Sequence, residues 1–252
     1  MVTIDLTGKS VLVTGGSRGI GAEAARLFVE AGASVGVNWL RSEGEANALV
    51  AELGRERAEP IRADLGDPAE VERMVERMLE RFGRIDVLVN NAGRFVANPF
   101  DGDDYEAWQR GWRRTIEVNL FGPANAAYLA MRAMRARGGG RIVNVASRAA
   151  FRGETEFADY GASKAALVNL TRSIARACAP LITAVGVAPG FVETDMAAEE
   201  IAAHRDELIR QVPLGRFATV AEVAAVIVFA ASSRADSLNG ATIDVNGGSW
   251  FQ

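Results

Sequence analysis

The stretch that decides the fold reads VLVTGGSRGIG and spans residues 11–21. A short run of branched apolar residues ends at Val13, and an alanine-rich segment follows Gly21. Gly15, Gly19 and Gly21 allow the backbone to turn tightly, to approach a phosphate and to bring the next helix close to the strand. Their spacing differs from the commonest dinucleotide fingerprint, Gly-x-Gly-x-x-Gly. The stretch therefore predicts a strand, a phosphate-binding loop and a helix.

The same alternation of short strands and longer helices continues along the chain. Most of the strand-like runs are apolar on both faces, which is typical of parallel strands covered by helices on each side. We therefore predict an α/β fold, a single doubly wound Rossmann-type domain with about seven parallel strands and helices on both faces. The expected strands are 10–13, 34–38, 59–63, 87–90, 141–146, 182–187 and 241–245, and the expected helices are 19–31, 42–56, 68–82, 104–137, 158–179 and 219–231.

The sequence predicts one domain over residues 1–252, because no Pro/Gly/Ser-rich linker and no internal repeat divides it. Gly138-Gly139-Gly140 is interpreted as a helix stop before the next strand. Asp67 and Pro68 predict a capped helix start. The segment 190–218 lies between a strand and a helix that do not need it, so we interpret it as an insertion on the substrate side.

Composition excludes several classes of protein. The chain has 28 basic and 32 acidic residues, a net charge of −4, and so lacks the basic excess of a nucleic-acid-binding protein. The chain has one histidine, His204, and one cysteine, Cys178, which excludes a Cys/His zinc site and an intrachain disulfide. The longest apolar run, 223–231, is far shorter than the roughly 20 residues that span a bilayer, and no signal peptide is recognisable. We expect a cytoplasmic protein with no metal, nucleic-acid or membrane partner.

Acid–base chemistry must then come from groups other than imidazole. Tyr160 and Lys164 are four residues apart and share one face of an expected helix. A free tyrosine has a pKa of about 10, and a neighbouring ammonium is expected to lower the Tyr160 pKa. Ser147 follows the fifth strand, where its hydroxyl can hydrogen-bond a carbonyl oxygen. Such a Tyr/Lys pair is also common on solvated helix surfaces, so its spacing alone leaves both interpretations open.

These motifs, taken in order, resemble the short-chain dehydrogenase/reductase family over essentially the whole chain, and are most similar to its 3-oxoacyl-[acyl-carrier-protein] reductases. Asn119, Ser147, Tyr160 and Lys164 fall where the family has its catalytic tetrad. The resemblance implies hydride transfer with a nicotinamide cofactor and Tyr160 as acid and base. It also implies that Lys164 holds the nicotinamide ribose and that Asn119 holds a proton-passing water.

The resemblance also implies a set of cofactor contacts. Asp64 corresponds to the family aspartate beside adenine, although an aspartate after a strand is commonly a turn cap. Residues 90–93 resemble the motif after the fourth strand, and Pro189, Gly190 and Thr194 resemble the segment at the nicotinamide carboxamide. The expected cofactor-binding residues are Gly15, Ser17, Arg18, Gly19, Ile20, Gly21, Asn38, Arg41, Ser42, Asp64, Leu65, Asn91, Ala92, Gly93, Tyr160, Lys164, Pro189, Gly190, Val192 and Thr194.

The end of the second strand indicates which nicotinamide cofactor is used. An acidic residue there would accept hydrogen bonds from a ribose 2′-hydroxyl and repel a 2′-phosphate. The strand ends instead in Asn38, and Arg18 and Arg41 lie in the adjoining loops. Two guanidinium groups suit a dianionic phosphate, so we predict that NADP(H) is preferred over NAD(H). Two solvated surface arginines are the alternative.

The residues leave the substrate open. The leading hypothesis is reduction of a ketone, such as a 3-oxoacyl thioester, to a secondary alcohol. The alternatives are an NAD(P)-dependent dehydrogenase of a small alcohol, sugar or steroid, and a noncatalytic dinucleotide-binding regulator. Residues 179–181 lack the basic side chain that often precedes the sixth strand in carrier-protein reductases, so an acyl carrier protein is a doubtful partner. Family members usually form tetramers, which implies a homotetramer here.

Overall fold

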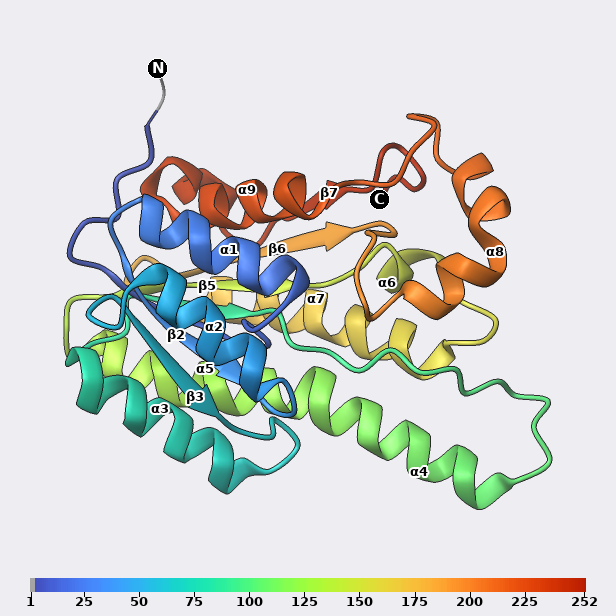
Figure 1. The fold of residues 1–252 in the computed structure, drawn as a ribbon, viewed down its shortest axis with the longest axis horizontal. Coiled ribbons are helices and arrows are strands. Elements are labelled where there is room, and N and C mark those ends of the chain that lie inside the picture. Colours follow the sequence, from blue (N-terminus) through green and yellow to red (C-terminus); the bar gives the residue numbers. More distant parts are fainter. Residues whose placement is uncertain (1–2) are drawn as a thin grey trace.

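The computed structural model of the chain describes residues 3–252, which form one seven-stranded parallel sheet of order β3-β2-β1-β4-β5-β6-β7 (Figure 1). Each strand lies within two residues of its predicted bounds, and the predicted doubly wound α/β fold is confirmed. The strands are β1 (Ser10–Val13), β2 (Ser34–Trp39), β3 (Ala58–Arg62), β4 (Val87–Asn90), β5 (Gly140–Val145), β6 (Ile182–Pro189) and β7 (Thr242–Val245).

Helices connect the strands and begin where the sequence supplies start signals. Asp67 accepts a hydrogen bond from the Ala69 N–H at 2.9 Å ahead of Pro68, as predicted. Thr219 and Glu222 cap the last long helix reciprocally. The helices are α1 (Gly19–Glu30), α2 (Glu43–Leu53), α3 (Pro68–Phe82), α4 (Tyr105–Ile116), α5 (Gly122–Arg135), α6 (Ala149–Arg152), α7 (Ala158–Cys178), α8 (Ala198–Arg210) and α9 (Val220–Ala231), with a π-helix η1 (Glu117–Phe121) and a 3-10 helix η2 (Ser233–Leu238).

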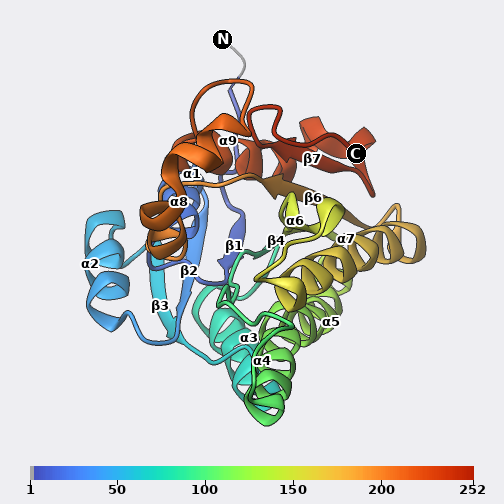
Figure 2. The same cartoon turned by 90° about the vertical axis from the view of Figure 1, so that its right-hand side faces the viewer.

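The sheet separates two hydrophobic cores. Side chains alternate along a strand, so Val11 and Val13 pack on the face covered by α1, α2 and α9. Leu12 points to the opposite face, where it packs with Met74 and Met78 beneath α3, α5 and α7. Figures 1 and 2 show these two helical layers on either side of the sheet. Burial on both faces explains why the strand sequences are apolar throughout.

The prediction of one helix over 104–137 was wrong in its middle. The structure has α4, then the π-helix η1, then α5. Pro123 has no N–H, so an α-helical hydrogen bond to the carbonyl of Asn119 cannot form there. The Gly122 N–H reaches back five residues to the Glu117 carbonyl instead, and the turn is widened. Such π-turns are frequent at functional sites, and this one contains Asn119.

The segment 190–218 folds around a small core of its own at the carboxyl edge of the sheet. Ile201, Leu208, Val212 and Phe217 are buried together in this core. A parallel bridge between Val192 and Ala218 joins the two ends of the segment. Its one long helix, α8, stands beside the carboxyl ends of the strands in Figure 1.

None of the helices in residues 3–252 has both the length and the apolar character needed to cross a membrane.

Candidate active site

The candidate site lies where the winding of the sheet reverses. From β1 the chain builds β2 and β3 on one side, then crosses to β4 on the other. In open α/β sheets, ligands bind outside the carboxyl ends of the strands at this point. The glycine loop follows β1, and residues 91–93 follow β4, so the topology brings these two predicted cofactor segments together.

Hydrogen bonds fasten the glycine loop to the segment after β4. The Asn91 side-chain amide donates to the carbonyls of Thr14 at 2.9 Å and Gly15 at 3.0 Å. The Thr14 hydroxyl accepts from the backbone N–H groups of Asn91 at 3.0 Å and Ala92 at 3.1 Å. A Cβ at Gly15 would lie 2.9 Å from Ala92 Cα, and one at Gly21 would lie 2.3 Å from the Gly15 carbonyl oxygen. The close contact therefore requires glycine at both positions.

Asn38, predicted to contact the cofactor, has its side chain engaged inside the protein. Its Oδ1 accepts from the Gly15 N–H at 3.1 Å. Its Nδ2 donates to the carbonyls of Ile61 at 3.3 Å and Ala63 at 3.2 Å. Asn38 thus ties the glycine loop to β2 and to the end of β3. A cofactor contact by Asn38 stays a prediction.

The start of α1 fits a bound phosphate. The helices α3, α4 and α9 begin with capping side chains, Asp67, Asp104 and Thr219. Within residues 3–252 no side chain caps α1, whose N-cap residue is Arg18. The N–H groups of its first turn and the positive end of its dipole are therefore available to an anion. This helix start and the glycine cradle beside it fit the pyrophosphate of a dinucleotide.

Arg18 and Arg41 lie at the surface beside this loop. Arg18 Nη1 is 3.2 Å from Asp195 Oδ2, and both side chains are more than half exposed. Exposed ion pairs contribute only about 0–1 kcal/mol, so Arg18 can exchange Asp195 for a ligand phosphate. Arg41 is exposed immediately before Ser42, the N-cap residue of α2. The approach of both arginines to one 2′-phosphate stays a prediction.

The segment after β6 reaches the glycine loop from the other side. The Gly190 N–H donates to the Val245 carbonyl at 3.1 Å, which fixes the chain just beyond Pro189. A Cβ at Gly19 would lie 3.2 Å from Thr194 Cγ2. The structure therefore places Thr194 against the glycine loop, and its contact with the nicotinamide carboxamide stays a prediction.

Asp64 is held by Arg114, a partner that the sequence analysis missed. Arg114 Nη2 donates to Asp64 Oδ1 at 2.7 Å, and the Gly66 N–H donates to the same oxygen at 2.8 Å. Burial acts to raise the Asp64 pKa, but these donors outweigh it and the pKa is lowered. Leu65 is buried under Gly122 of α5. Asp64 thus joins the end of β3 to α4, and its contact with adenine stays a prediction.

Lys164 and Tyr160 meet Ser147 between α7 and the end of β5. Lys164 is buried, and its Nζ donates to the Val145 carbonyl at 2.8 Å. The same nitrogen lies 5.6 Å from the centre of the Tyr160 ring. Burial lowers the Lys164 pKa to about 8. The four-residue spacing therefore places a cation beside the phenol, as predicted.

The predicted direction of the Tyr160 pKa shift was wrong for the protein alone. Burial around the hydroxyl raises the Tyr160 pKa to about 12, although the Ser147 hydroxyl beside it acts to lower that pKa. The negative charge of Glu154 adds to the rise. The Lys164 ammonium does not reverse it, because this group is itself desolvated and donates to a backbone carbonyl. Tyr160 is therefore held as a protonated phenol, the form that donates a proton.

Asn119 is fully buried inside the π-helix. Its Nδ2 donates to the Arg94 carbonyl and to Ser163 Oγ, both at 3.0 Å. Its Oδ1 accepts from the Arg94 N–H at 2.7 Å. The Ser163 hydroxyl in turn donates to the Tyr160 carbonyl at 2.7 Å. The side chain of Asn119 therefore fixes the segment at Arg94 next to α7, the helix that carries Tyr160.

A second buried network behind Tyr160 also escaped the sequence analysis. Asp159 Oδ1 accepts from the Tyr160 N–H at 2.8 Å, and its Oδ2 accepts from the Thr115 hydroxyl at 2.7 Å. Arg94 Nη1 donates to Thr115 Oγ1 at 3.1 Å. The signal in the sequence was an acidic residue in the first turn of the helix that carries Tyr160. Asp159 positions the start of α7 and, through it, the phenol.

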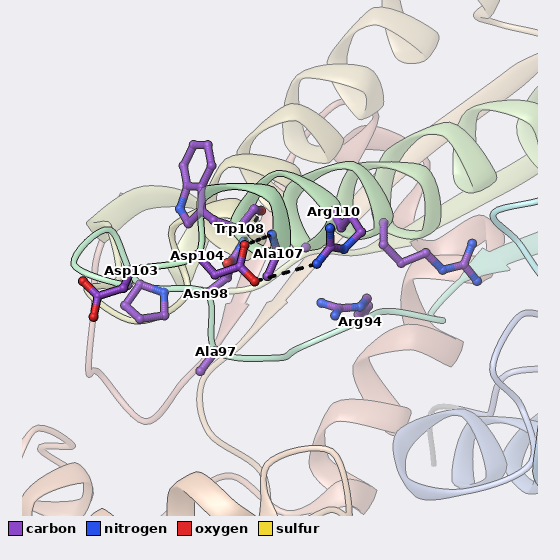
Figure 3. A pocket seen from close by; sticks show the side chains of 12 residues that line it. Arg94, Ala97, Asn98, Asp103, Asp104, Ala107, Trp108 and Arg110 are labelled. Atoms are coloured by element: carbon purple, nitrogen blue, oxygen red, sulfur yellow. Dashed lines mark hydrogen bonds and ion pairs between the residues drawn. The ribbon is translucent and has the colours of Figure 1, made fainter.

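An open hollow of about 580 Å³ adjoins Arg94 on the α4 side of the site (Figure 3). Asp104 and Arg110 form a loose ion pair of 3.9 Å across part of its wall. Three arginines and two aspartates give the lining a mixed charge. The lining residues are Arg94, Ala97, Asn98, Pro99, Gly102, Asp103, Asp104, Ala107, Trp108, Arg110, Gly111 and Arg114.

Metal-ligand side chains do not gather in the part of the chain that the structure describes. No group of three or more His, Cys, Asp or Glu residues with metal-binding geometry occurs in residues 3–252. His204 is exposed on α8, and Cys178 is a free thiol at the end of α7.

Comparison with known proteins identifies the family. The short chain dehydrogenase family matches residues 9–205. The chain belongs to this family. The 3-oxoacyl-[acyl-carrier-protein] reductase FabG of Staphylococcus aureus strain Mu50 is 36% identical over 246 residues, which cover 96% of this chain and 98% of the relative. FabG of Escherichia coli K12 is 36% identical over 249 residues, covering 98% and 100%.

Solved structures agree with this family. A short-chain dehydrogenase/reductase of the glucose/ribitol dehydrogenase type from Brucella melitensis has a TM-score of 0.91 and 36% identity, with both chains fully covered. A gluconate 5-dehydrogenase from Burkholderia cenocepacia, in complex with NADP and tartrate, has a TM-score of 0.89 and 35% identity, covering 97% of this chain and 96% of that one. This short-chain dehydrogenase is therefore an oxidoreductase that uses a nicotinamide dinucleotide.

Proposed function

We propose that the protein is an NADPH-dependent oxidoreductase that reduces a ketone to a secondary alcohol. The observation that carries the proposal is the protonated phenol of Tyr160, next to the Ser147 hydroxyl and the buried Lys164 cation, at the edge of the sheet where the glycine loop lies. A phenol, a hydroxyl and an ammonium suffice to bind a carbonyl and protonate it, without imidazole or metal.

Each residue of the tetrad then has a defined part in the mechanism. A reduced nicotinamide bound at this edge supplies the hydride that the carbonyl carbon receives. Ser147 donates a hydrogen bond to the substrate oxygen and orients it, and the Tyr160 hydroxyl donates its proton as negative charge develops there. The Lys164 ammonium stabilises the phenolate that remains. Asn119, whose carbonyl lacks an α-helical donor because of Pro123, holds a water that returns the proton.

The cofactor preference rests on two cations and on similar proteins. Arg18 and Arg41 are exposed beside the uncapped start of α1, and β2 ends in Asn38 and Trp39 rather than in an acid. Two similar solved structures, the gluconate 5-dehydrogenase and a further short chain dehydrogenase from Burkholderia cenocepacia, are described as complexes with NADP. These observations support NADPH over NADH.

Replacing both arginines tests this preference. We expect the double variant Arg18→Ala/Arg41→Ala to lower kcat/KM for NADPH by about 100-fold or more, because each charge-assisted hydrogen bond contributes about 1.5–3 kcal/mol. The value for NADH should change little, since NADH has no 2′-phosphate. Steady-state rates with both cofactors measure this, and Arg55→Ala, an exposed arginine in the loop before β3, is the control. Equal use of both cofactors by the unmodified protein would contradict the preference.

A substrate panel tests the reaction itself. Oxidation of NADPH, followed by its absorbance, is expected with a 3-oxoacyl thioester or a small ketone, and the reverse reaction with the matching secondary alcohol. Similarity to FabG supports a 3-oxoacyl thioester as the substrate of this chain, whereas similarity to the gluconate 5-dehydrogenase supports a small polyhydroxy acid. Sugar and steroid alcohols complete the panel. No turnover of any member, with NADPH still bound, would favour the noncatalytic regulator.

Domain organisation, assembly and location are part of the proposal. We propose that residues 1–252 act as one domain with 190–218 as its substrate-side insertion, and that four copies associate. Phe121 and Tyr128 are 57% and 61% exposed and lie about two helical turns apart in η1 and α5, which supports their burial against another copy. Light scattering measures the assembly.

A single free cysteine supports a cytoplasmic location, and an acyl carrier protein stays a doubtful partner.

A further inference from the structure

The side chain directly after Ser147 is a buried cation. The Arg148 N–H donates to the Pro189 carbonyl at 2.9 Å, which fixes the residue between the ends of β5 and β6. Arg148 is only 2% exposed, and within residues 3–252 neither Nη1 nor Nη2 has a hydrogen-bond partner. These two nitrogens carry four N–H donors.

Burying a guanidinium without a hydrogen-bond partner lowers the stability of the folded protein. The guanidinium cannot lose its proton, and a charge taken out of water needs a partner. The centre of the Phe191 ring lies 4.9 Å from Arg148 Cζ. An aromatic ring attracts the cation but accepts no ordinary hydrogen bond, so the four donors remain unsatisfied. Buried polar groups that stay unpaired in the protein point to a ligand.

The charged side chains around Arg148 are Arg152, Glu154 and, next to Glu154, Glu200. Arg152 lies one helical turn after Arg148, donates to Gln211 Oε1 at 3.0 Å and pairs with Glu154 Oε1 at 3.5 Å. Glu154 is thus engaged by Arg152, and it forms no hydrogen bond with Nη1 or Nη2 of Arg148. Burial lowers the Arg148 pKa, and the charge of Arg152 adds to the effect, while Glu154 opposes it. The carboxylates of this cluster therefore leave the Nη donors of Arg148 free for an anionic ligand.

We propose that Arg148 binds a carboxylate of the substrate, beside the carbonyl that Ser147 and Tyr160 bind. Two unpartnered nitrogens of a planar guanidinium match the two oxygens of a carboxylate. This inference rests on the proposed function and narrows its substrate class to oxo acids and the corresponding hydroxy acids.

Binding of an unreactive carboxylate tests the inference without turnover. Malonate binding to the NADPH-loaded protein is measured by calorimetry for the unmodified chain, for Arg148→Met and for the control Arg55→Met. We expect the malonate Kd to rise at least about tenfold in Arg148→Met and to be unchanged in the control. The melting temperature of Arg148→Met without malonate should be no lower, because a buried unpaired charge is removed. Arg148→Lys, which keeps the charge but loses the planar fork, should bind malonate with intermediate affinity.

Three binding results would overturn the inference. They are no malonate binding to the unmodified protein, equal affinity in Arg148→Met, and tighter binding of inorganic phosphate than of malonate. If neither Arg148 variant folds, the malonate-induced rise in the melting temperature of the unmodified protein, against no rise with neutral malonamide, decides the question.

A matched pair of substrates separates this inference from the proposed function. Acetoacetate and its methyl ester carry the same ketone and differ in the carboxylate. We expect the unmodified protein to have at least about tenfold higher kcat/KM for the acid, and Arg148→Met to lose that preference. Equal reduction of both, abolished by Tyr160→Phe, would overturn the carboxylate site and leave the reductase intact. If malonate bound through Arg148 but no ketone were reduced, the carboxylate site would stand and the proposed reductase activity would be overturned.

Discussion

Replacing Tyr160 by phenylalanine is expected to lower kcat about 10³-fold, because a positioned general acid contributes roughly 10²- to 10⁴-fold. The change removes one oxygen and keeps the ring that packs edge-on against Phe95, with centroids 4.9 Å apart. The backbone N–H that Asp159 fixes is unchanged as well. Cofactor affinity should therefore stay within about twofold, which separates a chemical role from a structural one.

The matched control is Tyr105→Phe, because Tyr105 is exposed at the start of α4 and its hydroxyl accepts a hydrogen bond from Gln109 on the same helix. It should retain full activity. Steady-state rates give kcat, and quenching of protein fluorescence gives the NADPH Kd. Turnover by Tyr160→Phe close to that of the unmodified protein would refute the mechanism.

The pH dependence of reduction reports on the same group of residues. The phenol stays protonated over the usual assay range, since the Tyr160 pKa is raised to about 12. The Lys164 pKa is lowered to about 8, so the ammonium is present below that pH and is lost above it. The rate of reduction at saturating cofactor is expected to fall as the pH rises through about 8. An unchanged rate between pH 7 and pH 9 would show that the Lys164 charge is not required.

The fold could be read from the sequence because its signals are local. Each strand is a short apolar run between turn residues, and the start of α3 is fixed by Asp67 and Pro68, adjacent in the chain. The π-helix was missed because it arises from two residues in an otherwise ordinary helical pattern. Pro123 removes a donor, and Gly122 donates five residues back instead.

The candidate site was predictable where a motif is continuous and not where partners are distant. Tyr160 and Lys164 share a helix, so their proximity follows from spacing alone. Arg114 and Asp64 are 50 residues apart, and their ion pair depends on how α4 packs beside β3. The spacing of residues in the sequence likewise does not predict how far a given side chain is removed from solvent. The burial that raises the Tyr160 pKa, and the packing of Arg148 against Phe191, exist only in the folded chain.

Replacing Gly21 by alanine is expected to weaken NADPH binding about 100-fold, equivalent to ~2.7 kcal/mol. A Cβ there would lie 2.3 Å from the Gly15 carbonyl oxygen and 2.6 Å from Asn91 Nδ2. Neither can retreat freely, because Asn91 Nδ2 donates to that same carbonyl at 3.0 Å. The glycine loop must shift instead, and with it the N–H groups that hold the phosphates. Overpacking of this kind costs about 1–3 kcal/mol, so the fold should survive with a lowered melting temperature.

Gly44→Ala supplies the matched control, since Gly44 is exposed in α2 and a Cβ there meets no atom within 4 Å. Alanine should stabilise that helix by about 0.5–1 kcal/mol and leave the NADPH Kd unchanged. The two variants add the same methyl group to a helix and differ in the space around it. If Gly21→Ala bound NADPH as tightly as Gly44→Ala, the phosphates would have to be held elsewhere than on the glycine loop.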